Sequence, residues 1–345
     1  MAETVRWGIL GTGRIASVFT RQLARSRTGR AVAVASRTQE SADRFAGQYN
    51  IPHVYSSYAA LLDDPDVDIV YISTPHHLHA EWSIAAAKAG KHILCEKPLA
   101  LNYAGALSII EAARHNDVFL MEAFMYRCHP QTARLVKMLR EKVIGDVRVI
   151  QATFGFHSVF DLAHRTLNHA LAGGGILDVG CYCVSMARLV AGVAGGKNFD
   201  EPLQVHGCGS IGDMSRVDEY AIASLRFPGN ILAQLATGVQ VDMENVVRIF
   251  GTEGYIVIPR PWVVSIDGGT SYIHVYKSGA MEPEVEEITT DDGLFTIEAD
   301  TVARFIPRRQ AEPPAMSWDD SLGNMKTLDL WRQAIGLIYD MERII

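Results

Sequence analysis

The stretch Val5-Arg6-Trp7-Gly8-Ile9-Leu10-Gly11-Thr12-Gly13-Arg14-Ile15-Ala16 decides the fold class of this chain. It places the pattern G-x-G-x-x-A between an apolar run and a helical one. Gly11 allows the tight turn out of a strand, Gly13 leaves room for a pyrophosphate, and Ala16 lets the helix pack closely on the sheet. The helix then offers its first N–H groups and the positive end of its dipole to the phosphates. We therefore expect a dinucleotide site at this turn, formed by Gly11, Thr12, Gly13, Arg14 and Ile15.

The second apolar run, residues 30–38, predicts which nucleotide binds. Its small and branched residues are typical of a buried parallel strand. A chain that binds NAD usually has Asp or Glu at the end of this strand, where it accepts from the ribose 2′-hydroxyl. Here the run ends in Ser36, Arg37 and Thr38, a cation between two hydroxyls that suits a 2′-phosphate. The sequence favours NADP, with NAD binding and a solvated surface arginine as the alternatives.

The alternation of segments predicts the architecture. Over the first 120 residues, strands are expected at 30–38, 66–74, 91–96 and from 119, and helices at 41–49, 80–89 and 101–115. This alternation indicates a doubly wound parallel sheet. Beyond Arg140, strand-like segments follow one another at 147–156, 204–209, 219–227, 231–240, 245–251 and 254–258, which indicates a large, mostly antiparallel open sheet. An amphipathic helix is expected from Trp318 to Glu342.

We therefore predict an α/β protein of two domains. Residues 1–122 form a dinucleotide-binding Rossmann domain, and residues 123–345 form an α+β domain for substrate binding and oligomerisation. The C-terminal helix belongs to the second domain or packs back on the first.

Composition narrows the class of partner. The 345-residue chain has a formal net charge of -7, which argues against nucleic acid and anionic membranes. We expect no stretch that is long and apolar enough to span a bilayer, and no signal peptide. Five scattered cysteines are interpreted as reduced, mostly buried thiols, so we expect a cytoplasmic protein. They are Cys95, Cys128, Cys181, Cys183 and Cys208.

The motifs, taken in order, resemble those of the glucose–fructose oxidoreductase, inositol dehydrogenase and MocA family of NAD(P)-dependent sugar and polyol dehydrogenases. The resemblance covers nearly the whole chain. Within the family, the chain is similar to the dimeric dihydrodiol dehydrogenase and NADP-dependent D-xylose dehydrogenase branch, which has Tyr where many members have His. The motifs are the glycine turn, Ser73-Thr74-Pro75-His76-x-x-His79, Glu96-Lys97-Pro98, the run from Met121 to Pro130, and Gly173-Gly174-Gly175-Ile176-Leu177-Asp178-Val179-Gly180-Cys181-Tyr182.

Three residues are the candidates for catalysis. Oxidation of a secondary alcohol needs a group that takes the hydroxyl proton as the hydride leaves. Lys97 follows an apolar strand, at the edge of the sheet where ligands bind. Asp178 and Tyr182 are four residues apart on an expected helix, so both point to one face. Lys97 could instead be a surface lysine paired with Glu96, and Tyr182 a packed core tyrosine. Which of Lys97 and Tyr182 carries the proton stays open.

The remaining candidates surround these three. His76 and His79 follow a strand end near the expected nicotinamide ribose, and no ligand set with metal spacing accompanies them, so no metal is predicted. The resemblance directs Arg127 and His129 toward the nicotinamide or the substrate. The expected cofactor contacts are Ser73, Thr74, Pro75, His76, His79, Glu96, Lys97, Ala123 and Arg127, and the expected substrate contacts are Lys97, His129, Phe156, Arg165, Asp178 and Tyr182.

The predicted function is hydride transfer between a nicotinamide cofactor and a CH–OH or C=O group of a sugar, anhydrosugar, cyclitol or trans-diol. The alternative is a non-catalytic, nucleotide-sensing regulator of the same fold. A homodimer or homotetramer is expected, because the second sheet has apolar residues on both faces and helices on one face only. Those residues are Ile222, Leu225, Phe227, Ile231, Leu232 and Leu235.

Overall fold

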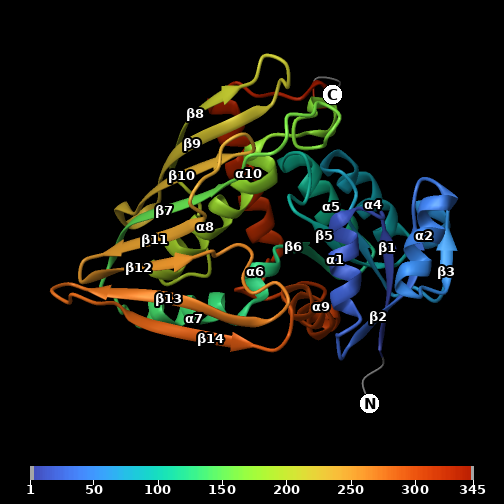
Figure 1. Ribbon diagram of the computed structural model, residues 1–345, viewed down its shortest axis with the longest axis horizontal. Helices are drawn as coiled ribbons and strands as arrows, with labels where there is room; N and C mark the ends of the chain where they lie inside the picture. Colours follow the sequence, from blue (N-terminus) through green and yellow to red (C-terminus); the bar gives the residue numbers. More distant parts are fainter. Residues whose placement is uncertain (1–3, 343–345) are drawn as a thin grey trace. The chain divides into compact units, whose positions relative to one another are not determined.

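The computed structural model describes residues 4–342 and divides the chain into two compact units. The first unit contains Met1–His129, Ser265–Gly269 and Thr290–Ser321, and the second contains Pro130–Val264, Thr270–Thr289 and Leu322–Ile345. The domain boundary predicted from the sequence lies after residue 122. The sequence does not predict that Ser265–Gly269 and Thr290–Ser321 join the first unit. Figure 1 shows the elements of each unit.

The first unit is built on a six-stranded parallel sheet in the order β3-β2-β1-β4-β5-β6. The order reverses between β1 and β4, and such a reversal opens a crevice at the carboxyl ends of the strands. The parallel Rossmann sheet predicted from the alternation is confirmed. The strands are β1 Val5–Leu10, β2 Gly29–Ala35, β3 His53–Tyr55, β4 Ile69–Ile72, β5 His92–Glu96 and β6 Leu120–Ala123.

Helices connect these strands, and one arrives from far along the chain. α9, Leu294–Phe305, packs against α1 and α6 and buries Phe295 and Glu298. α9 is not predictable from the sequence motifs, because its residues come after the second sheet and show no motif. The other helices of this unit are α1 Arg14–Leu23, α2 Gln39–Tyr49, α3 Tyr58–Leu62, α4 His79–Lys88, α5 Tyr103–His115 and α6 Met125–Cys128.

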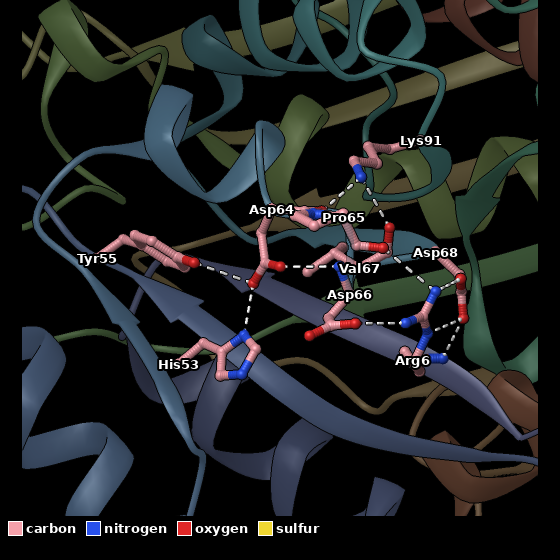
Figure 2. A network of polar contacts seen from close by, with 9 residues as sticks. All are labelled: Arg6, His53, Tyr55, Asp64, Pro65, Asp66, Val67, Asp68 and Lys91. Carbon is pink, nitrogen blue, oxygen red and sulfur yellow. Dashed lines mark hydrogen bonds and ion pairs between the residues drawn. The ribbon is translucent and has the colours of Figure 1, made fainter.

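A polar network ties the loop after α3 to β1 and β3 (Figure 2). The Asp64 carboxylate is bonded to His53 at 2.7 Å and to the Tyr55 hydroxyl at 3.0 Å, and Arg6 pairs with Asp66 at 2.8 Å. His53, Asp64 and Asp66 have ligand atoms close enough together to hold a metal ion. Protein groups already occupy these atoms, and the network holds the loop that leads into β4.

The second unit is built on an eight-stranded sheet in the order β14-β13-β12-β11-β7-β10-β9-β8 (Figure 1). β7 and β10 are parallel, and the other pairs with a resolved register are antiparallel, as predicted. The last two strands of the chain were not predicted. The strands are β7 Val147–Gly155, β8 Gln204–Ile211, β9 Asp218–Arg226, β10 Leu232–Gly238, β11 Val246–Gly251, β12 Gly254–Pro259, β13 Gly269–Lys277 and β14 Glu284–Thr290.

Helix α8, Cys181–Ala194, packs on β7 and β10, with α7, Pro130–Arg140, beside it. The segment His169–Ala194 that contains α8 is 26 residues long and apolar enough to cross a membrane by length and composition, contrary to the expectation that no stretch would qualify. Its apolar window is wholly buried, as in the core helix of a soluble protein. Short helical turns and glycines interrupt the segment, which is why it does not look like a membrane span in the sequence.

The C-terminal helix is shorter than predicted. α10 covers Trp318–Ala334 and ends before Gly336, whose φ of +74° is unfavourable for other residues. A short turn, Asp340–Glu342, replaces the last part of the predicted helix. α10 also buries polar side chains, such as Asn324 and Arg332, so a simple amphipathic pattern describes it poorly.

Candidate cofactor and catalytic site

The glycine turn has the geometry that a pyrophosphate needs. Gly11 has a φ of +101°, and a Cβ there would lie 3.0 Å from Ser73 Oγ. A Cβ on the exposed Gly13 would meet nothing within 4 Å, so the space in front of this residue is open. Gly13 is the N-cap of α1 and provides no side-chain cap. These features fit a dinucleotide whose phosphates take the first amides of α1.

The end of β2 offers one cation. Arg37 is exposed, and no acidic group in residues 4–342 forms an ion pair with it. Ser36 is buried, and its hydroxyl lies 3.1 Å from that of Thr12. Thr38 caps α2, accepting from the Ser41 amide at 3.3 Å. Of the three predicted 2′-phosphate contacts, Arg37 is the charged one, and its side chain is exposed. The Thr38 hydroxyl already accepts a hydrogen bond at the start of α2.

His79, the first residue of α4, connects the segments that follow β4 and β5. It is fully buried, and its two ring nitrogens lie 2.8 Å from the carbonyl oxygens of Thr74 and Pro98. Burial lowers the pKa of His79 to about 4. Ser73 donates to the Leu10 carbonyl at 2.9 Å, which joins the ends of β1 and β4. His76 is also buried, with its ring centroid 5.8 Å from that of His79.

Lys97 follows β5 at the carboxyl edge of the parallel sheet, and its side chain is partly exposed. The preceding Glu96 is buried, accepts from the Tyr71 hydroxyl at 2.5 Å, and accepts from the Lys97 amide at 3.3 Å. Glu122 accepts from the Leu99 amide at 2.8 Å. Two buried carboxylates therefore accept hydrogen bonds from the backbone on either side of Pro98, in the loop that carries Lys97.

Two predicted residues near the end of the first unit are fully buried. The Arg127 guanidinium pairs with Asp320 at 2.6 Å and donates to the Pro314 carbonyl at 2.6 Å. Burial lowers the pKa of His129 to about 4. Ala123, at the end of β6, is buried as well. A role for Arg127 in cofactor binding stays a prediction, and the partner Asp320, 193 residues later, was not visible in the sequence.

In the second unit, Asp178 and Arg165 form a bidentate ion pair. The guanidinium donates to the two carboxylate oxygens at 3.0 and 3.3 Å. The Asp178 side chain is 3% exposed and that of Arg165 is 48% exposed, so a buried carboxylate lies under a half-exposed cation. Asp178 lies in a π-helical turn, Ile176–Gly180, and Tyr182 lies in the first turn of α8.

Aromatic rings surround Tyr182, which is 4% exposed. Its ring centroid lies 5.3 Å from that of Phe154 and 5.9 Å from that of Trp262. Phe154 and Trp262 stack at 5.8 Å with an interplanar angle of 10°. Neither residue was predicted, because β7 and the segment after β12 show no sequence signal that links them to Tyr182. The predicted Phe156 is only partly buried, just past β7.

Segments of both units match known protein families. Residues 5–124 match the description "Oxidoreductase family, NAD-binding Rossmann fold", and residues 132–257 match "GFO/IDH/MocA C-terminal domain". The chain belongs to the GFO/IDH/MocA oxidoreductase family. The family assignment made from the motifs is confirmed.

Individual GFO/IDH/MocA proteins resemble this chain over nearly its whole length. A trans-1,2-dihydrobenzene-1,2-diol dehydrogenase of Xenopus laevis is 34% identical over 97% of this chain and 99% of its own. A 3-ketoreductase from Actinomadura kijaniata, solved with TDP-benzene and NADP, has a TM-score of 0.86 at 26% identity, covering 96% of this chain and 98% of its own. An aldose-aldose oxidoreductase from Caulobacter crescentus has a TM-score of 0.84 at 28% identity, covering 96% and 97%.

These relatives are named as oxidoreductases, so the enzyme interpretation is confirmed over the alternative of a non-catalytic regulator. The protein is an NAD(P)-dependent oxidoreductase with a Rossmann domain of the NAD-binding type.

Proposed function

We propose that this protein is an NADP-dependent dehydrogenase or ketoreductase of a polyhydroxylated ring or trans-diol, with Lys97 and Tyr182 in proton transfer. The placement of Lys97 carries the proposal. It is a partly exposed lysine on a loop whose backbone amides donate to buried carboxylates, at the edge of the parallel sheet that also holds the Gly11 turn. Ligands of open α/β sheets bind at this edge.

The preference for NADP rests on Arg37. A guanidinium binds a phosphate with charge-assisted hydrogen bonds, and Arg37 has no acidic partner among residues 4–342. The pyrophosphate would accept hydrogen bonds from the amides at the start of α1, and Arg37 would bind the 2′-phosphate. The Actinomadura ketoreductase of the same family was solved with NADP, which supports this choice.

When bound, the nicotinamide accepts or donates the hydride. The residues of this chain would handle the accompanying proton. A tyrosine hydroxyl or a lysine ammonium can give a proton to a carbonyl oxygen, or take one from an alcohol. Burial among Phe154 and Trp262 fixes the orientation of the Tyr182 ring, and Asp178 offers a buried carboxylate four residues before it. Structures of the Actinomadura ketoreductase include variants at one tyrosine and one lysine, the residue types proposed here.

The substrate class follows from the second unit and the relatives. Arg165 and Asp178 offer donors and acceptors for hydroxyl groups, and the aromatic residues beside Tyr182 suit the apolar face of a ring. Relatives act, by their names, on a trans-dihydrodiol or on aldoses. We propose a cyclic substrate with adjacent hydroxyl groups, as a pyranose or a trans-diol provides.

We also propose a homodimer or homotetramer formed through the open sheet. α8 packs on one side of the second unit's sheet, against β7 and β10, and α7 packs against α8. On the other face, Ile222 is 52% exposed and Leu232 is 50% exposed. The other apolar residues named for this sheet in the sequence are buried, because successive side chains of a strand point to opposite faces. They are Leu225, Phe227, Ile231 and Leu235. The cytoplasmic location stays a proposal, supported by five free cysteines.

A spectrophotometric assay tests the proposed activity. Absorbance at about 340 nm reports the nicotinamide redox state as the enzyme is mixed with NADP or NADPH and a panel of aldoses, anhydrosugars, cyclitols and trans-diols. We expect turnover with at least one cyclic vicinal diol or its ketone, faster with NADP(H) than with NAD(H). Absence of turnover across the panel, in a protein that binds NADP, would contradict the proposed substrate class.

A further inference from the structure

A fully buried carboxyl group, that of Asp218 on β9, lies against the glycine run before α8. Its Oδ2 accepts from the Ile176 amide at 2.6 Å. Its Oδ1 is so close to the run that a Cβ on Gly174 would lie 2.1 Å from it. Gly174 also has a φ of +113°. Glycine is therefore required at this position both by its backbone conformation and by the approach of Asp218.

Residues from other parts of the second unit form hydrogen bonds with the neighbouring peptide groups of the glycine run. The Tyr339 hydroxyl donates to the Gly173 carbonyl at 2.5 Å, and Thr237 on β10 donates to the Gly175 carbonyl at 3.1 Å. The Gly174 amide donates to the Thr166 carbonyl at 2.9 Å. Among these contacts, the one from Asp218 differs, because its carboxyl oxygen accepts from the Ile176 amide, at the first residue of the π-helical turn.

This turn leads directly to the proposed catalytic residues. Asp178 lies inside it, and Tyr182 follows in the first turn of α8. The first amides of a helical segment have no partner within the segment, and a carboxyl oxygen that accepts from one of them fixes where the segment begins. A displacement there would shift Asp178 and Tyr182 together, and misplacement of about 1 Å can cost roughly 100-fold in rate.

We infer that Asp218 is a positioning residue, whose buried carboxyl group anchors the segment that carries Asp178 and Tyr182. The consequence for catalysis rests on the proposed function, whereas the anchoring itself does not. The groups around Asp218 determine its pKa. Burial raises the pKa of Asp218 to about 7, and hydrogen bonds from backbone amides, including that of Ile176, and the charge of Arg332 on α10 oppose the rise. The Tyr339 hydroxyl is a further titratable group that interacts with Asp218.

Hydrogen exchange in the full-length protein tests the anchoring without any substrate. In the wild type, we expect the Ile176 amide to exchange more slowly, by about 10-fold or more, than the amides of Arg14 and Ile15 at the uncapped start of α1. Asp218→Ala should remove this protection from the peptide covering residues 174–182. Asp218→Asn, which keeps an acceptor oxygen of the same reach, should retain it. Ser215→Ala is the matched control, because Ser215 is also buried and its hydroxyl donates to Glu219 instead.

Kinetics then separate positioning from simple stability. We expect Asp218→Ala to lower kcat by about 10-fold or more while the Kd for NADP stays within about twofold, and Asp218→Asn to restore kcat. Fast exchange of Ile176 in the wild type, or wild-type protection in Asp218→Ala, would overturn the inference. If Asp218→Ala does not fold, the wild-type and Asp218→Asn exchange rates decide the question. Absence of turnover in the wild type would count against the proposed function, and the exchange result would still stand.

Discussion

The guanidinium of Arg165 donates to both carboxylate oxygens of Asp178, at 3.0 and 3.3 Å. The pair joins an irregular loop to the turn that leads into α8, and only its cationic member reaches solvent appreciably. A bidentate contact of this kind fixes the orientation of the carboxylate as well as its charge.

Removal of this cation should impair turnover more than cofactor binding. In Arg165→Met, Asp178 loses the group that orients its buried carboxylate, so we expect kcat/KM for the sugar or diol to fall by about 10- to 100-fold. The Kd for NADP, measured by fluorescence titration, should not change. Arg165→Lys keeps the charge without the bidentate geometry and should be intermediate. Equal activity in all three proteins would show that the pair has no role in the site.

Cofactor choice should depend on Arg37. In Arg37→Asp, attraction to the 2′-phosphate becomes repulsion, and an acceptor for a ribose hydroxyl appears. We expect the ratio of kcat/KM for NADP to that for NAD to fall by about 100-fold or more. Arg44→Asp, also exposed and on the adjacent α2, is the control for a general loss of positive charge. An unchanged ratio in Arg37→Asp would remove the assignment.

Proton transfer should depend on Lys97 and Tyr182. Lys97→Met should abolish turnover while NADP still binds, because binding rests on the glycine turn. Tyr182→Phe keeps the ring packed against Phe154 and Trp262 and removes only the hydroxyl, so kcat should fall by about 10²- to 10⁴-fold if Tyr182 carries the proton. A near-normal kcat in Tyr182→Phe would assign the acid/base role to Lys97.

The raised pKa of Asp218 predicts that the free energy of unfolding depends on pH. Because its pKa is raised to about 7 in the folded protein, the folded state holds its proton over a range where the unfolded state has released it. The contribution is therefore fully present below about pH 4, where both states are protonated, and it is lost as the pH rises from there through about 7. Between about pH 5 and 8, we expect wild type to lose roughly 2 to 3 kcal/mol of unfolding free energy relative to Asp218→Asn. Urea titrations of both proteins at the two pH values measure this difference, and parallel pH profiles would contradict it.

Assembly should depend on the open sheet face. Sedimentation at micromolar concentration should give at least twice the 37.9 kDa chain mass. Ile222→Glu together with Leu232→Glu places charges in the exposed apolar positions, and we expect it to yield monomers without loss of the fold. Gln48→Glu on the exposed side of α2 is the control. A wild-type monomer, or an unaffected oligomer in the double variant, would exclude this face as the subunit contact.

The sequence by itself determined the parallel sheet of the first unit, most strands of the second, and the family. These features depend on patterns within short segments, such as the glycine turn before α1 and the alternation in β9 and β10. Local sterics and side-chain periodicity act over only a few residues, so a few residues are enough to reveal them. Lys97 and Arg37 were proposed as site residues in the same way, from their places after β5 and β2.

Only the tertiary structure decided which groups meet across long stretches of chain. The partners Asp320 of Arg127, Trp262 of Tyr182, and Asp218 of Ile176 come from other elements. So does α9, which returns to the first unit after the second sheet. Buried polar groups must be satisfied, but any donor or acceptor of suitable reach can do so. The sequence therefore shows that such partners must exist, and the packing of distant elements selects them.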